Sequence, residues 1–524
     1  MIGRLGEQIV DRPIDLSDPF PPSADYPTIR SNPTRRALFL IAAGWLSLAS
    51  LWVWRCTWDD SYILFRYARN FANGLGIVFN PGQRVEGYTS LLWVCVLGLS
   101  SRIGWHPPLA AKVWGILLNL VALVACYILC QLLATDRAPM HGLALLLTAG
   151  NAYFIVTSTA GLETPLFTAL LCWGVVACLK GEHGVDGKSQ QRWQVGASVL
   201  FALLVMTRPD GALTYFLLWL YTAWRFRSRP ICLALFTLPF VLIYTPYFLW
   251  RWHYYGFLLP NTFYAKGGGT LALLWKGAAQ TAKFLTLQTG GGLAAAAVGL
   301  AVILFPTAET TVLGLAIISR IIFELWSGGV TPGEYRFLVP ALPLIWILME
   351  RVLVGSVWAG GMRPRVRYLV SGICTVLMTA QIVAFVYFRR HNVEPVQNGM
   401  ERAHVGLGKW LASHSAPNAQ VAVGDIGAIG FWSGREILDI DGLVDSHISH
   451  LPGIFGEKQD SQYILEQNPE FIILRASVCK PDLTHVSFLP DRELFSNPRF
   501  QTDYGQVGCW EFWPGYDLVV YKHG

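Results

Sequence analysis

The run Val113–Leu133, VWGILLNLVALVACYILCQLL, has no charged residue and has the roughly 20 residues that a helix needs to cross a bilayer. Similar runs recur up to about residue 388, separated by short polar loops. This alternation predicts a polytopic α-helical membrane protein with eleven membrane helices. The other ten predicted helices are Ala37–Trp54, His141–Ser158, Pro165–Leu179, Val195–Met206, Ala212–Trp224, Ile231–Trp250, Leu293–Phe305, Thr311–Leu325, Phe337–Met349 and Tyr368–Phe388.

The composition of the whole chain agrees with this prediction. Of the 524 residues, 53% are hydrophobic and only 14% are charged, whereas soluble proteins carry roughly 25% charged residues. A soluble cytoplasmic enzyme, collagen, a coiled coil and a disordered chain are therefore excluded. The net charge is only +6 and the basic residues are scattered, so we predict no nucleic-acid partner.

The basic residues of the loops predict the orientation of the helices. Residues 1–36 are polar and rich in proline, which predicts a disordered cytoplasmic tail ahead of the membrane domain, residues 37–388. We interpret Ser90–Gly104 and Leu271–Leu287 as helices on the outer surface, because counting Ser90–Gly104 as a span would invert every later loop. The N-terminus then lies inside and the C-terminus outside. The basic residues in the predicted inner loops are Arg137, Lys180, Lys188, Arg192, Arg225, Arg227, Arg229, Arg363, Arg365 and Arg367.

Residues 389–524 are polar and alternate between short strands and helices, which predicts an extracytoplasmic α/β domain. Cys479 and Cys509 would lie there in an oxidising compartment, where they could be bonded to each other or free. The predicted strands are Gln420–Val423, Glu436–Ile440, Glu470–Leu474 and Leu518–Tyr521, and Ile426–Ser433 is a predicted helix.

The predicted first outer loop, residues 55–106, contains the most informative polar residues. In Trp58–Trp93, WDDSYILFRYARNFANGLGIVFNPGQRVEGYTSLLW, Asp59 and Asp60 begin a helical pattern. Asp59 and Arg66 would share one helix face, about 10 Å apart along the axis, a spacing that suits two groups facing one substrate. A second polar cluster, consisting of Arg84, Glu86 and Tyr88, closes the loop. These three residues and Arg66 are candidates for binding the donor phosphate or the substrate.

Two interpretations of the acidic pair are open. Acids in the first turn of a helix commonly complement the helix dipole and have no further role. A carboxylate at the membrane boundary could instead serve as a general base, with nearby cations receiving a phosphate leaving group. The arginines at positions 66, 69 and 84 favour the second interpretation, because basic residues are usually sparse on the outer side.

The first-loop motif resembles the GT-C superfamily of polytopic glycosyltransferases, and most of all the branch of the terminal arabinofuranosyltransferases. The similarity extends to transferases that add aminoarabinose and galacturonic acid to lipopolysaccharide. The resemblance implies a polyprenyl-phosphate sugar donor, transfer at the outer face of the bacterial inner membrane, and catalytic acids in the first outer loop. Asp59 or Asp60 matches the catalytic aspartate. We expect Asp59 to be the base, because it shares a face with Arg66, and Asp60 to position the acceptor or a metal.

Four further motifs supply candidate site residues. Glu163 in GLETP is either a second acid or an ordinary helix-start residue. Arg208 in TRPDG could hold an anionic headgroup. Asn261 and Lys266 in PNTFYAK, with Arg336 in a later outer loop, are candidates for binding the donor phosphate. Arg320 and Glu324, four residues apart on one predicted helix, are expected to form a buried structural pair.

The sequence thus predicts an inverting membrane glycosyltransferase that moves a sugar from a polyprenyl-phosphate donor to an envelope glycan or glycolipid. A lipid-linked sugar transporter and a non-catalytic membrane scaffold are the alternatives. The segment GDIGAIG, residues 424–430, lacks the GxGxxG spacing of a dinucleotide site and is expected to serve strand–helix packing. No metal-ligand motif is present in the sequence. A divalent cation beside the first-loop acids stays an open possibility.

Overall fold

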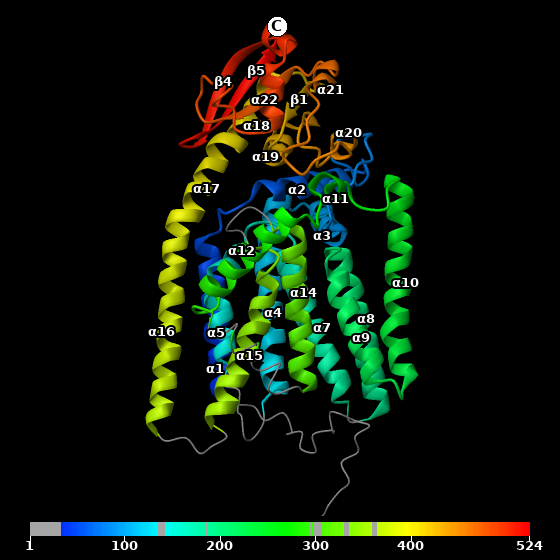
Figure 1. Ribbon diagram of the computed structural model, residues 1–524, viewed down its shortest axis with the longest axis vertical. Helices are drawn as coiled ribbons and strands as arrows, with labels where there is room; N and C mark the ends of the chain where they lie inside the picture. Colours follow the sequence, from blue (N-terminus) through cyan, green and yellow to red (C-terminus); the bar gives the residue numbers. More distant parts are fainter. Residues whose placement is uncertain are drawn as a thin grey trace, which may run out of the picture.

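The computed structural model describes residues 33–134, 142–184, 186–292, 307–329, 335–358 and 364–524, together with the single residues 296 and 299. Figure 1 shows an elongated molecule in which a bundle of long helices lies below a smaller domain that contains the C-terminus. Short helices occupy the level between the two parts.

The helices of the bundle follow the apolar blocks of the sequence. Three described helices, α4, α7 and α10, are long and apolar enough to cross a membrane. Of the predicted helix Leu293–Phe305 only the single residues 296 and 299 are described, so the number eleven stays a prediction. The bundle helices are α1 (Pro33–Trp52), α4 (Pro107–Leu132), α5 (Leu143–Gly150), α6 (Ala152–Thr157), α7 (Thr164–Glu182), α8 (Gly187–Thr207), α9 (Gly211–Arg225), α10 (Pro230–Tyr255), α14 (Ala308–Ser327), α15 (Leu342–Trp358) and α16 (Pro364–Phe388).

Two predicted spans differ in detail. His141–Ser158 contains two helices, α5 and α6, because Asn151 interrupts the helix and its side chain accepts hydrogen bonds from the N–H groups of Tyr153 and Phe154, at 3.0 and 3.2 Å. This is the usual role of an N-cap asparagine. The span predicted from Phe337 opens with a 3₁₀ turn, Val339–Ala341, before α15 begins.

The level between the bundle and the outer domain holds α2 (Asp59–Ala72), α3 (Leu91–Arg102), α11 (Asn261–Lys266) and α12 (Leu271–Gln288). Helix α3 has 12 residues, too few to cross a bilayer. Helix α12 runs obliquely to the bundle in Figure 1. Both helices coincide with the segments predicted to lie at the outer surface.

The outer domain is built on one sheet with the strand order β2-β1-β3-β5-β4. Strands β2, β1 and β3 are parallel, whereas β5 is antiparallel to both β3 and β4. Helix α19 (Ile426–Ser433) connects β1 to β2, and Cys479 and Cys509 form a disulfide. The strands are β1 (Gln420–Val423), β2 (Glu436–Asp439), β3 (Phe471–Ala476), β4 (Tyr504–Trp513) and β5 (Tyr516–His523).

A continuous helical rod joins the bundle to the outer domain. Helix α16 is followed directly by the π-helix η2 (Arg389–Val393), α17 (Glu394–Gly399), the π-helix η3 (Met400–Val405) and α18 (Gly406–His414). In Figure 1 this rod forms the left edge of the molecule and rises into the outer domain. The change of composition at Arg389 therefore falls within a helix.

Candidate active site

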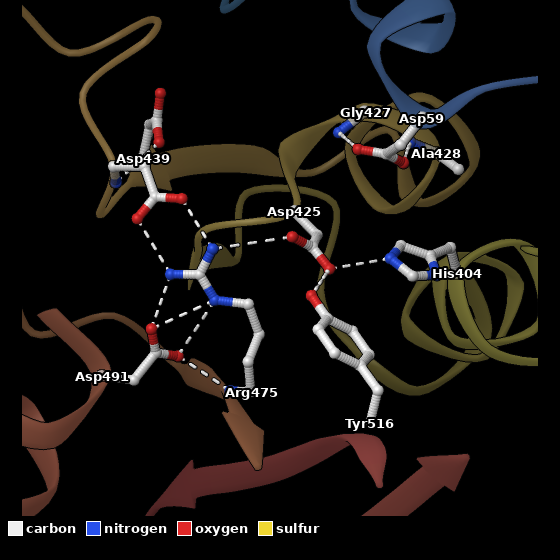
Figure 2. Close-up of polar contacts among 10 residues, drawn as sticks. Asp59, His404, Asp425, Gly427, Ala428, Asp439, Arg475, Asp491 and Tyr516 are labelled. Atoms are coloured by element: carbon white, nitrogen blue, oxygen red, sulfur yellow. Dashed lines mark hydrogen bonds and ion pairs between the residues drawn. The ribbon is translucent and has the colours of Figure 1, made fainter. Parts of the chain in front are cut away.

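Asp59 and Asp60 are neighbours on α2 but have different partners. The carboxylate of Asp59 accepts hydrogen bonds from the backbone N–H groups of Gly427, at 3.0 Å, and Ala428, at 2.8 Å (Figure 2). These amides belong to the first turn of α19, where backbone N–H groups have no partner within the helix. Asp59 thus fastens the membrane domain to the outer domain.

The surroundings of Asp59 also affect its protonation. Burial raises the pKa of Asp59 to about 6, the charge of His404 opposes this change, and the charge of Asp425 adds to it. Both carboxylate oxygens are occupied by amides of α19, so Asp59 is poorly placed to accept a proton from a substrate.

Asp60 faces cations instead of backbone amides. Its side chain is 46% exposed, and its Oδ2 accepts a hydrogen bond from Nη1 of Arg336 at 3.0 Å. Partial burial tends to raise the pKa of Asp60, but the positive charges of Arg336 and Lys266 outweigh this effect and hold it below its ordinary value. The structure thus brings together Asp60, Arg336 and Lys266, which lie far apart in the sequence.

Arg208 and Glu163 lie next to this group. Nη1 of Arg208 is 3.5 Å from the backbone oxygen of Arg336, and Nε of Arg208 is 3.9 Å from a carboxylate oxygen of Glu163. Arg208 also donates two hydrogen bonds of 3.0 Å to Asp210. The charge of Arg208 is therefore largely balanced by these two acids. An arginine that binds a phosphate would be expected to lack such partners.

The prediction that Arg320 and Glu324 form a buried ion pair is wrong. Arg320 forms an ion pair with Asp210, and its Nη2 donates to Oγ1 of Thr214 at 3.0 Å. The carboxylate oxygens of Glu324 are buried and have no hydrogen-bond partner among the residues described. Spacing along one helix could not reveal that Asp210, in the turn directly before α9, competes for the arginine.

Arg66 is turned away from Asp60 and into the contact with the outer domain. Its guanidinium donates to the carbonyl oxygens of Phe79, Gly430 and Arg435, at 2.7–2.8 Å, and to Oδ1 of Asn80 at 3.0 Å. The side chain is buried, and these acceptors occupy four of its five N–H groups. We therefore do not include Arg66 among the residues proposed to bind the donor.

The other polar residues of the first loop hold the loop in place. Glu86 forms a buried ion pair with Arg251 of α10, and the hydroxyl of Tyr88 is 3.0 Å from that of Tyr255 on the same helix. The guanidinium of Arg84 lies over the ring of Tyr254, 4.8 Å from its centre. These contacts give Arg84, Glu86 and Tyr88 a structural explanation that their spacing in the sequence did not suggest.

Asn261 binds the outer domain as well. Its Nδ2 donates to the carbonyl oxygens of Gly442, at 2.9 Å, and Leu443, at 3.0 Å. Helix α11 thereby extends from this anchor, at Asn261, to Lys266 at its other end, beside Asp60.

A buried charge network in the outer domain was missed by the sequence analysis. The guanidinium of Arg475 on β3 donates two hydrogen bonds to Asp441 and three to Asp491, and Asp425 lies 3.6 Å away. Asp425 in turn accepts hydrogen bonds from Tyr516, at 2.7 Å, and His404, at 2.8 Å (Figure 2). The available signal was an arginine within the otherwise apolar strand FIILRA, since a buried charge requires a partner.

The residues around Asp60 are a poor fit for a divalent cation. Arg336 and Lys266 make its surroundings electropositive, and the oxygens of neighbouring Asp59 are engaged by backbone amides. Within the described ranges, the one cluster of three potential ligand residues contains Cys479 and Cys509, which are bonded to each other.

Comparisons with known proteins agree with the family resemblance of the first loop. Residues 391–521 match a family model described as a domain of unknown function (DUF8728). A terminal beta-(1->2)-arabinofuranosyltransferase of Mycobacterium tuberculosis is 30% identical over 249 residues, 42% of this chain and 38% of that protein. Its counterpart in Corynebacterium glutamicum is 29% identical over 279 residues, 48% and 39% of the two chains. The chain thus spans about two fifths of the length of these curated relatives.

A solved structure extends the comparison to nearly the whole chain. ArnT from Cupriavidus metallidurans, in a crystal structure with bound undecaprenyl phosphate, matches with a TM-score of 0.60 and 15% identity. The match covers 93% of this chain and 97% of that chain, and at this identity it concerns the fold alone. The chain therefore has the fold of the GT-C membrane glycosyltransferases, and its sequence is similar to that of terminal arabinofuranosyltransferases.

Proposed function

We propose that this protein is an inverting glycosyltransferase that takes a sugar from a polyprenyl-phosphate donor and transfers it to a glycan or glycolipid of the bacterial envelope. The pair formed by Asp60 and Arg336, with Lys266 beside it, carries the proposal. It supplies a carboxylate that can accept a proton next to cations that can hold a phosphate. The names of the curated relatives favour a pentose, arabinofuranose, as the sugar.

In the proposed reaction, Arg336 and Lys266 bind the phosphate of the donor. Arg208 contacts the backbone oxygen of Arg336 and helps to hold it in position. Binding of the phosphate draws Arg336 away from Asp60 and removes a charge that lowers the pKa of this acid. Asp60 thereby becomes a better base at the moment when the donor is in place. In this proposal Asp60 takes the role of base that the sequence analysis gave to Asp59, and Asp59 holds the outer domain through the amides of α19.

Bond formation and bond breaking then proceed on opposite faces of the sugar. The acceptor hydroxyl oxygen attacks the anomeric carbon and its proton passes to Asp60. The bond from this carbon to the phosphate oxygen breaks, and polyprenyl phosphate leaves with the electron pair. Attack opposite the leaving group inverts the anomeric configuration. Arg336 and Lys266 balance the negative charge that develops on the leaving phosphate.

The proposed location is the inner membrane, with eleven spans, the N-terminus inside and the site at the outer face. Helices α2 and α11, which carry Asp60 and Lys266, lie at the level between the bundle and the outer domain, and this position supports the proposal. Polyprenyl-phosphate donors lie within the bilayer, and the acceptor would approach from the outer domain.

The test is a transfer assay with the purified protein in lipid nanodiscs. Polyprenyl-phosphate arabinofuranose is offered alongside other polyprenyl-phosphate sugars, with an arabinofuranosyl oligosaccharide as acceptor. We expect transfer from the arabinofuranose donor, and NMR of the product should show the anomeric configuration opposite to that of the donor. Retention of configuration would reject the direct displacement, and absence of transfer from every donor would reject the enzyme.

A further inference from the structure

A cleft lies between the end of α1 and the rod that carries the outer domain. Its volume is about 310 Å³, at the lower end of the range of small-ligand sites, about 300–1,000 Å³. One wall comes from the end of α1 and the turn after it, and the other from the rod around α17. The lining residues are Leu51, Trp52, Trp54, Arg55, Arg389, Glu394, Gln397 and Asn398.

The walls of this cleft are held in place by contacts of the lining residues with one another and with neighbouring side chains. Trp52 packs against Phe385, with ring centres 5.9 Å apart, and Arg389 lies over the ring of Trp52 at 4.6 Å. Arg389 also forms an ion pair of 2.7 Å with Glu394. In the turn after α1, the backbone oxygen of Trp54 accepts a hydrogen bond from Lys112. A ligand would therefore meet a preformed site.

The polar groups that remain available can both donate and accept hydrogen bonds. Within the described part of the chain, the side-chain amides of Gln397 and Asn398 and the guanidinium of Arg55 have no hydrogen-bond or ion-pair partner. Two indole rings lie beside them. Flat aromatic rings next to amide groups suit a sugar, because its ring presents C–H groups on its faces and hydroxyl groups around its edge.

The small net charge of the cleft favours a neutral sugar over an anionic lipid as its ligand. Glu394 balances Arg389, so the cleft has a net charge of one positive unit from Arg55. A site built for a phosphate headgroup would present several uncompensated cations. A neutral ligand with many hydroxyl groups fits this set of side chains better.

We propose that this cleft is a glycan-binding subsite that holds the acceptor oligosaccharide at a distance from the reacting sugar. The inference rests on the proposed function, in which Asp60 is the base. Five peptide units connect Arg55 to Asp60, so their Cα atoms are at most about 19 Å apart. An oligosaccharide of several sugars can span this distance. Binding in the cleft would select acceptors by length and add affinity without touching the reacting atoms.

The experiment measures binding without transfer. An arabinofuranosyl hexasaccharide is titrated by calorimetry into Asp60→Asn protein in nanodiscs of zwitterionic lipid, with no donor present. We expect the additional double substitution of Gln397→Ala and Asn398→Ala to raise Kd about tenfold, equivalent to about 1.4 kcal/mol. Asn392→Ala, an exposed asparagine of the same rod outside the cleft, is the matched control and should leave Kd unchanged.

A second measurement uses the protein with Asp60 intact. The same double substitution should raise KM for the hexasaccharide and leave KM for a disaccharide acceptor and kcat unchanged, a pattern that a general structural defect would not produce. Equal Kd values with and without the double substitution, or loss of hexasaccharide binding when phosphatidylglycerol is added to the nanodiscs, would overturn the subsite. Transfer to the disaccharide tests the proposed function independently, because it does not need the cleft.

Discussion

At the level of single residues, Asp59 and Asp60 carry the same charge and begin the same helix, yet only one of them is available to a substrate. Asp59 binds two amides of α19, whereas Asp60 binds the side chain of Arg336. The amphipathic pattern of α2 could not separate them, because the two residues that bind Asp59 lie more than 360 positions later in the chain. Long-range contacts of this kind leave no local signal in the sequence.

The first prediction concerns this division of roles. Asp60→Asn should reduce kcat for sugar transfer by a factor of about 10²–10⁴, the contribution expected of a general base. Asp59→Asn should reduce it less than tenfold, because asparagine retains one oxygen that can accept an N–H bond. Steady-state assays in nanodiscs compare the two variants. A larger loss in Asp59→Asn than in Asp60→Asn would restore the assignment suggested by the sequence.

The second prediction concerns the cation that faces Asp60. Arg336→Gln should raise KM for the polyprenyl-phosphate donor at least tenfold, since it removes a positive charge from the proposed phosphate site. Arg336→Lys should recover part of this loss, because it keeps the charge but not the planar guanidinium. The acceptor KM is the internal reference and should change little. If both substitutions affect only the acceptor KM, Arg336 does not hold the donor.

At the level of elements, α2 is the main contact between the membrane domain and the outer domain. Arg66 joins three segments through four hydrogen bonds, and Arg69 donates a single bond of 2.8 Å to the carbonyl of Phe431. Asn80 adds a pair of hydrogen bonds to Ile437, next to the contacts of Arg66. These hydrogen bonds from the first loop therefore position the outer domain on the membrane domain.

The third prediction follows from these contacts. Arg66→Met should weaken the docking of the outer domain by about 3 kcal/mol, because several buried carbonyl oxygens lose their partner at once, each at a cost of about 1–3 kcal/mol. Arg69→Met, which loses one bond, should cost about 1 kcal/mol. Hydrogen exchange of the α19 amides, followed by mass spectrometry, measures both. Equal protection in the two variants would contradict a docking role for Arg66.

The elements themselves were predictable to different degrees. Helix α19 and strand β1 have the predicted bounds, because short apolar segments between turn residues are clear local signals. Strand β4 was missed, since this edge strand is largely exposed and lacks an apolar run. The break between α5 and α6 was also missed, as it depends on one side chain, Asn151, within an apolar block.

For the molecule as a whole, the fold could be inferred from the apolar blocks and from the first-loop motif. The site, in contrast, depends on how three segments that are distant in the sequence come together. Asp60, Lys266 and Arg336 were each identified as candidates, but their mutual contact required the fold. Arg66 was selected because it shares a helix face with Asp59. In the structure that face is covered by the outer domain, whose position no local pattern reveals.

The junction between the two domains should make their docking dependent on pH. Burial raises the pKa of Asp59 to about 6, so its favourable contribution is present below pH 4 and is lost as the pH rises through 6. Burial alone would lower the pKa of His404, but its hydrogen bond to Asp425 and the charges of Asp425 and Asp59 raise it, while Arg475 opposes them. The contribution of His404 is therefore present below pH 6.5 and declines above it.

The fourth prediction is that protection of the α19 amides, corrected for the intrinsic exchange rate, falls as the pH increases from 5 to 8. Asp59→Asn should remove the part of this fall below about pH 6, because asparagine does not titrate. His404→Gln keeps a donor for Asp425 without a titrating charge, so it should remove the part above pH 6.5. The carboxyl of Asp425, whose pKa is lowered by His404 and Arg475 despite its burial, stays ionised over this range and adds no slope. Protection that is the same at pH 5 and pH 8 in the unmodified protein would show that neither group is coupled to docking.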